Sequence, residues 1–173
     1  MLTQFLSSYR DYHYKFLVFV SEHGAEEEQQ YIEELLSYQI EGLIVLSHTL
    51  PSEKLASYQI PVIAIEREAE HISSVNTDNY MGALQATSLL IRDKCDILIH
   101  INVNVNKSAP AYDRIWAFQA TCEEYHVPYD IDLSVKGASY HELLDVIREI
   151  FNKIESKYPD QKKRYLSCER YLC

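Results

Sequence analysis

Short runs of apolar residues alternate along the chain with segments whose apolar residues recur at helical spacing. The runs cover residues 15–20, 42–46, 61–65 and 97–101. Continuous apolar runs of this length are typical of strands that are covered on both faces. We therefore predict a strand at each run, a brief extended piece at 74–77, and a weaker strand at 131–135, where acids alternate with apolar residues.

The segments between these runs predict helices with one apolar face. They cover residues 2–12, 26–38, 51–58, 79–92, 110–125 and 139–154. Thr77 or Asp78 can cap the helix that begins at Asn79, and Ser139 with Glu142 forms a capping box. Strands and helices that alternate in this way indicate an α/β fold in which a parallel sheet carries helices on both faces.

Charge narrows the range of possible partners. The chain has 26 acidic and 16 basic residues, which gives a net charge of −10. An acidic surface repels phosphate groups, so we expect no specific binding to duplex DNA by the chain alone and no docking on anionic membranes. Since no apolar run reaches the roughly 18 residues that cross a bilayer and residues 1–8 lack a signal-peptide pattern, we expect a cytoplasmic protein.

Common motifs for cofactor, metal and catalytic chemistry do not occur in the sequence. Its four glycines allow neither G-x-G-x-x-G nor G-x-x-x-x-G-K. The four cysteines form no C-x-x-C pair and are expected to be free thiols. There is also no H-E-x-x-H and no G-x-S-x-G pattern. We therefore expect no cofactor, no metal site and no catalytic residues.

Polar residues follow several predicted strands, where ligands bind in an open parallel sheet. They lie at residues 21–23, 47–48, 66–67 and 102–106. These residues are able to hydrogen-bond a hydroxylated ligand, but loops after strands are polar in any case, so both interpretations stay open. His100 lies inside an apolar strand and is expected to be a hydrogen-bonded core residue.

Arg114 is the most distinctive candidate for a ligand-binding residue. It lies one turn after Pro110, just beyond the polar stretch that follows the strand at 97–101. A guanidinium group there can form a forked pair with ligand hydroxyls or a carboxylate. The alternative is a surface ion pair with Asp113 or Glu123, which the residues alone favour.

Four further segments match a known pattern when they are taken in order. They read IEGLIVL at 40–46, IPVIAIER at 60–67, VNTDNYMGA at 75–83 and RIWAF at 114–118. These segments resemble the v-d-G-i-I, i-P-v-V-x-i-d-r, V-x-x-D-n-x-x-G-g and R-x-x-G-F motifs of the LacI/GalR family of bacterial transcription regulators. Ala117 stands in place of the last glycine, and the resemblance extends over residues 5–158.

The resemblance implies a periplasmic-binding-protein-like (type I) fold that closes on a small, sugar-like ligand. Residues 1–105 would form the N-terminal lobe without its first strand, 106–158 the start of the C-terminal lobe, and 159–173 a divergent tail. By the same resemblance Arg114 contacts the ligand, Tyr80 and Met81 line the cleft, and Asp78 caps the helix beside it.

The implied function is effector sensing in a regulator that is a homodimer in its full-length form. DNA would be bound only through a helix-turn-helix domain, which this chain lacks. A sugar-binding protein of an uptake system is the alternative, since it shares the fold, but the missing signal peptide and the unpaired cysteines disfavour it. The missing first strand would separate 16–20 from 43–46, so we expect low stability or association through exposed sheet edges.

Overall fold

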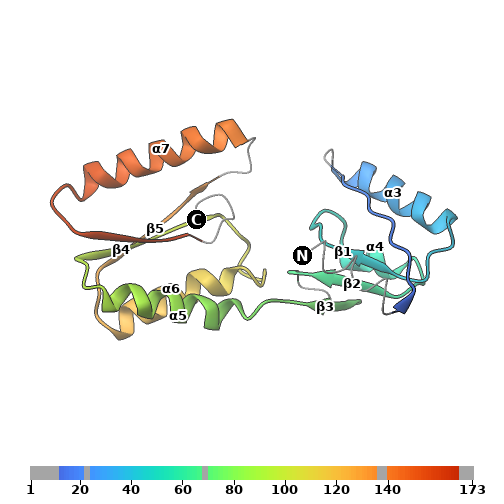
Figure 1. Cartoon of the computed structure of the whole chain (residues 1–173), viewed down its shortest axis with the longest axis horizontal. Coiled ribbons are helices and arrows are strands. Elements are labelled where there is room, and N and C mark those ends of the chain that lie inside the picture. Colours follow the sequence, from blue (N-terminus) through green and yellow to red (C-terminus); the bar gives the residue numbers. More distant parts are fainter. Residues whose placement is uncertain (1–11, 22–23, 68–69, 136–139, 168–173) are drawn as a thin grey trace. The chain divides into compact units, whose positions relative to one another are not determined.

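The computed structural model describes residues 12–21, 24–67, 70–135 and 140–167, and contacts divide the chain into two compact units (Figure 1). Unit 1 comprises Met1–Ile65 and Ala69–Val75, and unit 2 comprises Glu66–Glu68 and Asn76–Cys173. The contacts thus divide the chain near residue 76 and not near residue 105. The assignment of 1–105 and 106–158 to two lobes stays a prediction.

Unit 1 contains a short parallel sheet. Its elements are α3 (Ala25–Ser37), β1 (Leu43–Val45), α4 (Ser52–Ala56), β2 (Val62–Ile65) and β3 (Ser73–Val75). The strand order is β1-β2-β3, with Leu43 opposite Val62 and Ile63 opposite Ser73. The core of the unit joins Ile32 of α3 and Leu55 of α4 to Val45 and Val62 of the sheet.

The strand expected at residues 15–20 is wrong. Of the described residues 12–21, none lies in a strand, and Leu17, Val18 and Val20 are more than half exposed. The ring of Phe19 lies 5.2 Å from that of Tyr31 on α3, which holds the segment against the helix. An apolar composition favours a strand, but a strand also needs a neighbour to pair with, and none of the described strands of unit 1 pairs with this segment.

Unit 2 contains a second parallel sheet with helices on both of its faces. Its elements are α5 (Asn79–Arg92), β4 (Ile97–Val103), α6 (Tyr112–Glu124), β5 (Tyr129–Val135), α7 (Tyr140–Lys157) and β6 (Lys163–Ser167). The strand order is β5-β4-β6, and both ladders are parallel. Figure 1 shows α5 and α6 side by side on one face of this sheet and α7 on the other.

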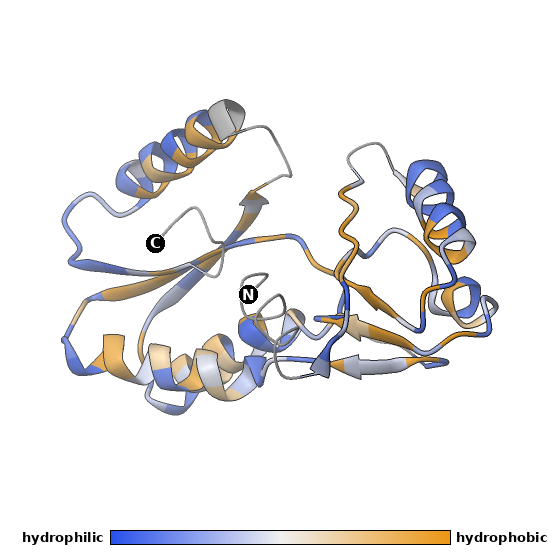
Figure 2. Ribbon diagram, turned by 45° about the vertical axis from the view of Figure 1, so that its right-hand side comes forward, coloured by the Kyte–Doolittle hydropathy of each residue, from blue (hydrophilic) through white to orange (hydrophobic). Residues whose placement is uncertain are grey.

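The central strand β4 contributes to two cores at once. Alternate side chains of a strand point to opposite faces of the sheet. Ile97, Ile99 and Ile101 pack with Val135 and the apolar face of α7, whereas Leu98 packs with Phe118 and Cys122 of α6. Figure 2 shows the resulting contrast between the hydrophobic β4 and the more polar β6. The run at 97–101 is apolar except for His100 because both of its faces are covered.

The segment after residue 159, which is expected to be a divergent tail, contains a strand, and its divergence from the family stays a prediction. Lys163–Ser167 forms β6, which pairs with β4 so that Ile99 lies opposite Tyr165. β6 lies at an edge of the sheet, where charged residues are tolerated. Its Lys163 pairs with the carboxylate of Glu155, and its Arg164 pairs with that of Asp93. Hydrophobicity alone therefore did not reveal the strand.

The helices agree with the sequence prediction wherever the structure describes them. Asp78 caps α5 by accepting a hydrogen bond from the backbone N–H of Met81 at 3.0 Å. The helix expected at 2–12 lies almost wholly outside the described residues, as does the capping residue Ser139. Within the described part of the chain, no helix is both long and apolar enough to span a membrane.

Several helices end on a residue with a left-handed backbone. Gln39 (φ 55°), Gln59 (φ 57°), Lys94 (φ 50°) and His126 (φ 54°) each lie just beyond a helix of the chain. Glycine is the usual residue at this position because it has no Cβ to clash with the backbone. In this chain larger side chains take its place, which explains how the helices terminate despite the small number of glycines.

Candidate functional site

Arg114 is held by Asn79 in the helical layer of unit 2. The Nε–H of Arg114, in the first turn of α6, donates to Oδ1 of Asn79, the first residue of α5, at 2.6 Å. Asn79 is 5% exposed, and Arg114 is half-buried. Helices α5 and α6 lie side by side (Figure 1), so residues separated by 35 positions meet at their N-terminal ends.

A carboxylate holds the other end of the Asn79 side chain. Glu66, which follows β2 but belongs to unit 2, accepts a hydrogen bond from Nδ2 of Asn79 at 3.4 Å. It also accepts the backbone N–H of Thr77 at 2.7 Å and the hydroxyl of Thr77. Burial raises the pKa of the Glu66 carboxyl, but these hydrogen bonds and the charge of Arg114 outweigh it and hold the pKa below its usual value.

His100 and Asn102 lie in the interior of unit 2 near this cluster. His100 is fully buried on β4 and hydrogen-bonds the amide of Asn102 through Nε2 at 3.3 Å. Burial, together with the positive charge of Arg114, lowers the pKa of His100 to about 4, so the imidazole is neutral at pH 7. The expectation of a hydrogen-bonded core histidine is confirmed.

Tyr80 and Met81 lie in the same turn of α5 as Asn79. The ring of Tyr80 packs against that of Trp116 at 5.1 Å, and Trp116 is 56% exposed on α6. Met81 is 43% exposed, and its described contact is the backbone cap made with Asp78. Asn79 therefore contacts Arg114 directly. Tyr80 contacts Trp116, which lies on the same helix as Arg114. A ligand-lining role for Tyr80 and Met81 stays a prediction.

Two residues of this cluster were not singled out from the sequence. Asn79 had no signal of its own, since a polar residue at a helix start is ordinary. Trp116 is the one tryptophan of the chain and lies within the R-x-x-G-F-like segment. The sequence did not show that its side chain is exposed, because the exposed face of this helix was not known. Arg114 pairs with Asn79, and the alternative of a surface pair with Asp113 or Glu123 stays open.

Ser47 and Asn106, two of the polar residues at other strand ends, have partners close by. Ser47, after β1, donates its hydroxyl to the buried carboxylate of Glu28 on α3 in unit 1. The side chain of Asn106 accepts the backbone N–H of Ser108 and so shapes the loop before α6. Ser47 and Glu28 stabilise their own unit, and the cluster around Arg114 remains the candidate site.

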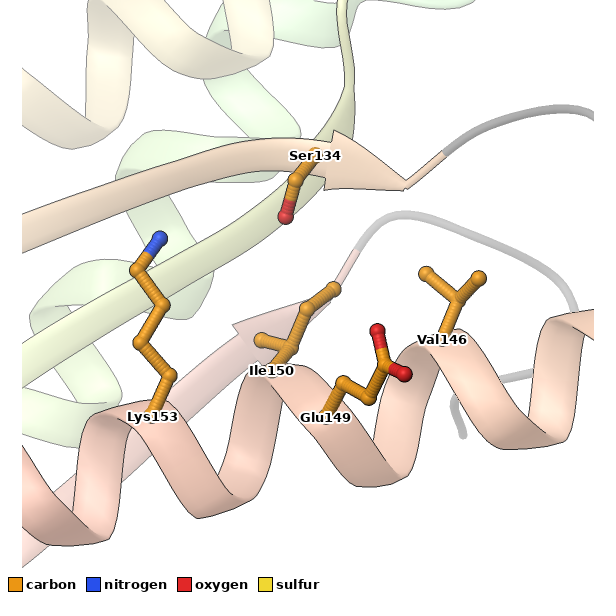
Figure 3. Close-up of a pocket in the computed structure, with 5 residues that line it drawn as sticks. All are labelled: Ser134, Val146, Glu149, Ile150 and Lys153. Atoms are coloured by element: carbon orange, nitrogen blue, oxygen red, sulfur yellow. The ribbon is translucent and has the colours of Figure 1, made fainter.

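A pocket of about 320 Å³ lies between β5 and α7. Ser134 points into it from the strand, while Val146, Ile150 and Lys153 point toward the strand from the helix (Figure 3). None of the residues predicted to bind the ligand lines this pocket. It is separated from the Arg114 cluster by the sheet itself, because α6 and α7 cover opposite faces (Figure 1).

Cysteine and metal chemistry receive no support from the described part of the chain. Cys95 and Cys122 are free, and burial raises the pKa of the Cys122 thiol to about 12, which makes it an inert core residue. Cys168 and Cys173 lie outside the described residues. No group of three or more metal-ligating side chains is found among residues 12–21, 24–67, 70–135 and 140–167.

Sequence comparison finds relatives among the repressors of sugar operons. The chain is 30% identical over 102 residues to the sucrose operon repressor of Lactococcus lactis subsp. lactis, a match that covers 58% of this chain and 32% of that protein. It is 29% identical over 117 residues to the ribose operon repressor of Halalkalibacterium halodurans, covering 67% and 35%. No protein-family model matches the sequence. The matches span about a third of the length of these curated relatives.

Solved structures agree on the fold. The probable maltose operon transcriptional repressor MalR from Staphylococcus aureus superposes with a TM-score of 0.79 at 18% identity, covering 99% of this chain and 61% of that one. The Cra transcriptional dual regulator from Pseudomonas putida, solved with fructose 1-phosphate, gives 0.74 at 16% identity, covering 99% and 63%. The expected α/β, periplasmic-binding-protein-like fold is confirmed. The sequence relatives are repressors of sugar operons, in agreement with the resemblance to LacI-type regulators.

Proposed function

We propose that the chain supplies part of the effector-binding domain of a LacI-type sugar-operon repressor and that it senses a small sugar. The observation that carries this proposal is Arg114, which lies in the R-x-x-G-F-like segment and is fixed by Asn79 between the N-terminal ends of α5 and α6. An effector that binds one arrangement of a regulator better than another shifts its equilibrium. In the full-length regulator this shift alters the affinity for DNA.

The effector chemistry follows from the groups around Arg114. A guanidinium group offers several fixed N–H donors, which suit the hydroxyl groups of a sugar or the oxygens of a sugar phosphate. The neighbouring Tyr80 and Trp116 supply aromatic rings against which the apolar face of a sugar ring packs. Tyr80 and Met81 then line the ligand, as the family resemblance implies.

Several properties of the full-length protein belong to the same proposal. It is cytoplasmic, it acts as a homodimer, and it contacts DNA through a helix-turn-helix domain and not through the residues described here. It binds its effector without transforming it, in keeping with the repressor relatives. The uptake-protein alternative is not favoured, because the sequence relatives are operon repressors.

Calorimetric titration of the purified chain tests the proposal. The probes are sucrose, D-ribose, D-fructose and fructose 1-phosphate, and we expect at least one of them to bind. Arg114→Lys removes the Nε–H that meets Asn79 and is expected to weaken that binding by about tenfold or more, since hydrogen bonds to charged groups are among the strongest. Arg148→Lys, on the exposed face of α7, is the matched control and should leave affinity unchanged.

The outcomes separate two parts of the proposal. If none of the four probes binds the unaltered chain, sensing of these sugars by this chain is wrong. If a probe binds and Arg114→Lys behaves like Arg148→Lys, the chain is a sugar-binding module whose contact residue is not Arg114.

A further inference from the structure

We propose that Glu66 is a positioning residue for Arg114 and that it acts by fixing the orientation of the Asn79 amide between them. The inference rests on the proposed function, in which Arg114 contacts the effector. Glu66 itself follows β2 and precedes the loop to β3, so it lies 48 positions before Arg114 in the chain. Its role follows from a chain of hydrogen bonds and not from contact with a ligand.

The chain of hydrogen bonds has a defined direction. Asn79 donates through Nδ2 to Oε2 of Glu66 at 3.4 Å, and Asn79 accepts at Oδ1 the Nε–H of Arg114 at 2.6 Å. The other carboxylate oxygen of Glu66 is occupied by the backbone N–H and hydroxyl of Thr77. Glu66 is therefore held in place by Thr77, and its second oxygen is aimed at Asn79.

The chemistry of an amide makes this direction matter. An asparagine side chain has an acceptor end and a donor end, which exchange places when the amide turns over. An ionised carboxylate only accepts, and the Nε–H of arginine only donates. With Glu66 on one side and Arg114 on the other, one orientation of Asn79 satisfies both neighbours, whereas the reverse orientation opposes oxygen to oxygen and donor to donor.

Burial gives the orientation an energetic consequence. Asn79 is 5% exposed, so water does not readily replace a hydrogen bond that the amide loses. A group at position 66 that donates toward Asn79 would turn the amide over and place its NH₂ group against the Nε–H of Arg114. Arg114 would then lose the hydrogen bond that Asn79 now accepts from its Nε–H, although no atom of Arg114 had been altered.

A pair of substitutions isolates this effect from a loss of charge or packing. Glu66→Gln keeps the size of the side chain and lets it donate toward Asn79. In the double variant Glu66→Gln with Asn79→Asp, residue 79 accepts from both sides, so the hydrogen bond to Arg114 is possible again. The double variant also has the net charge of the unaltered chain, because one carboxylate has moved from position 66 to position 79.

The readout is the Nε–H signal of Arg114 in ¹⁵N-resolved NMR, assigned by its disappearance in Arg114→Lys. This signal requires no sugar. We expect Glu66→Gln to shift it and to speed its exchange with water by about tenfold, and we expect the double variant to restore it. Glu124→Gln, on the exposed end of α6, is the matched control and should leave the signal unchanged.

Affinity supplies the second readout. For any of sucrose, D-ribose, D-fructose and fructose 1-phosphate that binds the unaltered chain, Glu66→Gln should weaken binding by about tenfold and the double variant should recover it. Thermal unfolding identifies variants that have lost their fold. If the single variant Glu66→Gln is unfolded and the double variant is folded, the double variant is sufficient to test the proposal. The proposal requires the double variant to keep the Arg114 signal.

Two results would overturn the positioning role. One is an Arg114 signal that is unchanged in folded Glu66→Gln, and the other is a folded double variant that does not recover the signal. A merely structural role for Glu66 predicts the second result, since the swap would restore nothing. If the NMR results agree with the proposal while no sugar binds, the positioning of Arg114 stands and the proposed effector class fails.

Discussion

The ammonium group of Lys153 on α7 lies 2.8 Å from a carboxylate oxygen of Asp132 on β5. The Asp132 side chain is 8% exposed, and its other oxygen accepts the backbone N–H of Ser134 at 2.9 Å and the Ser134 hydroxyl. One helical turn further on, Lys157 makes the same kind of pair with Asp130 at 2.8 Å. The two pairs join α7 to the edge strand of the sheet in unit 2.

Removal of the Lys153 ammonium should destabilise unit 2. Lys153→Met keeps most of the aliphatic stem but leaves the buried Asp132 carboxylate without its charged partner. Because Lys153 itself is largely exposed, we expect a loss of about 1 kcal/mol in the free energy of unfolding. Urea denaturation measures it, with Lys107→Met in an exposed loop as the control. Equal stability of the two variants would show that the pair contributes nothing measurable.

The burial of His100 predicts a dependence of stability on pH. The pKa of His100 falls from 6.5 to about 4 on folding, so the unfolded chain binds the proton more readily. Stability from this group is therefore complete above the unfolded pKa and declines as pH falls from about 6.5 toward 4. The full effect is on the order of 3 kcal/mol.

Denaturant unfolding at pH 7 and pH 5 tests the role of His100. His100→Phe retains a ring beside Phe118, which lies 5.0 Å away, and removes the titration. We expect the unaltered chain to lose more stability between the two pH values than this variant does. A pH dependence that is identical in both proteins would assign the effect to the carboxylates.

The left-handed residue after α5 offers a stabilising substitution. Lys94 is exposed and has φ 50°, a conformation that costs a side chain with a Cβ about 1 kcal/mol relative to glycine. We therefore expect Lys94→Gly to raise the free energy of unfolding by about 0.5–1 kcal/mol. Arg92→Gly, two residues earlier and within α5, should lower it by about 1 kcal/mol. The same sign for both variants in thermal unfolding would contradict this account.

The exposed apolar side chains of unit 1 predict self-association. Leu17, Val18 and Val20 lie on a segment outside any strand, and Ile44 and Leu46 are exposed at and just beyond β1. Sedimentation velocity should show reversible association that increases with concentration, and Val18→Lys should reduce it. Leu89→Lys, 62% exposed on α5 in unit 2, is the control. A monomer at all concentrations would show that these side chains are harmless to solubility.

Strands and helices were predictable where a local pattern has one structural solution. The run at 97–101 and the helical spacing in 79–92 each correspond to an element of nearly the same length. Residues 15–20 carry an equally clear apolar run, but pairing depends on what lies beside the segment, which no local pattern contains. β6 was missed because its own sequence is polar. It forms a strand because it pairs with the hydrophobic strand β4.

The candidate site was predictable only in part. Arg114 could be chosen because it belongs to a recognisable segment, and Asp78 because helix capping is local. The partner of Arg114 could not, since Asn79 lies 35 positions away and meets it only when α5 and α6 pack together. Glu66 was noted as a polar residue after a strand, but its link to Arg114 passes through Asn79 and is visible only in three dimensions.

The double burial of β4 has a consequence for local opening of unit 2. This strand is bonded along both edges, to β5 and β6, and is covered on both faces. Its amide hydrogens exchange with solvent only when the sheet itself separates, whereas those of the exposed edge strand β3 need only a small fluctuation. In hydrogen–deuterium exchange, a peptide covering residues 97–101 should be the last in unit 2 to take up deuterium, and one covering 73–75 should exchange early.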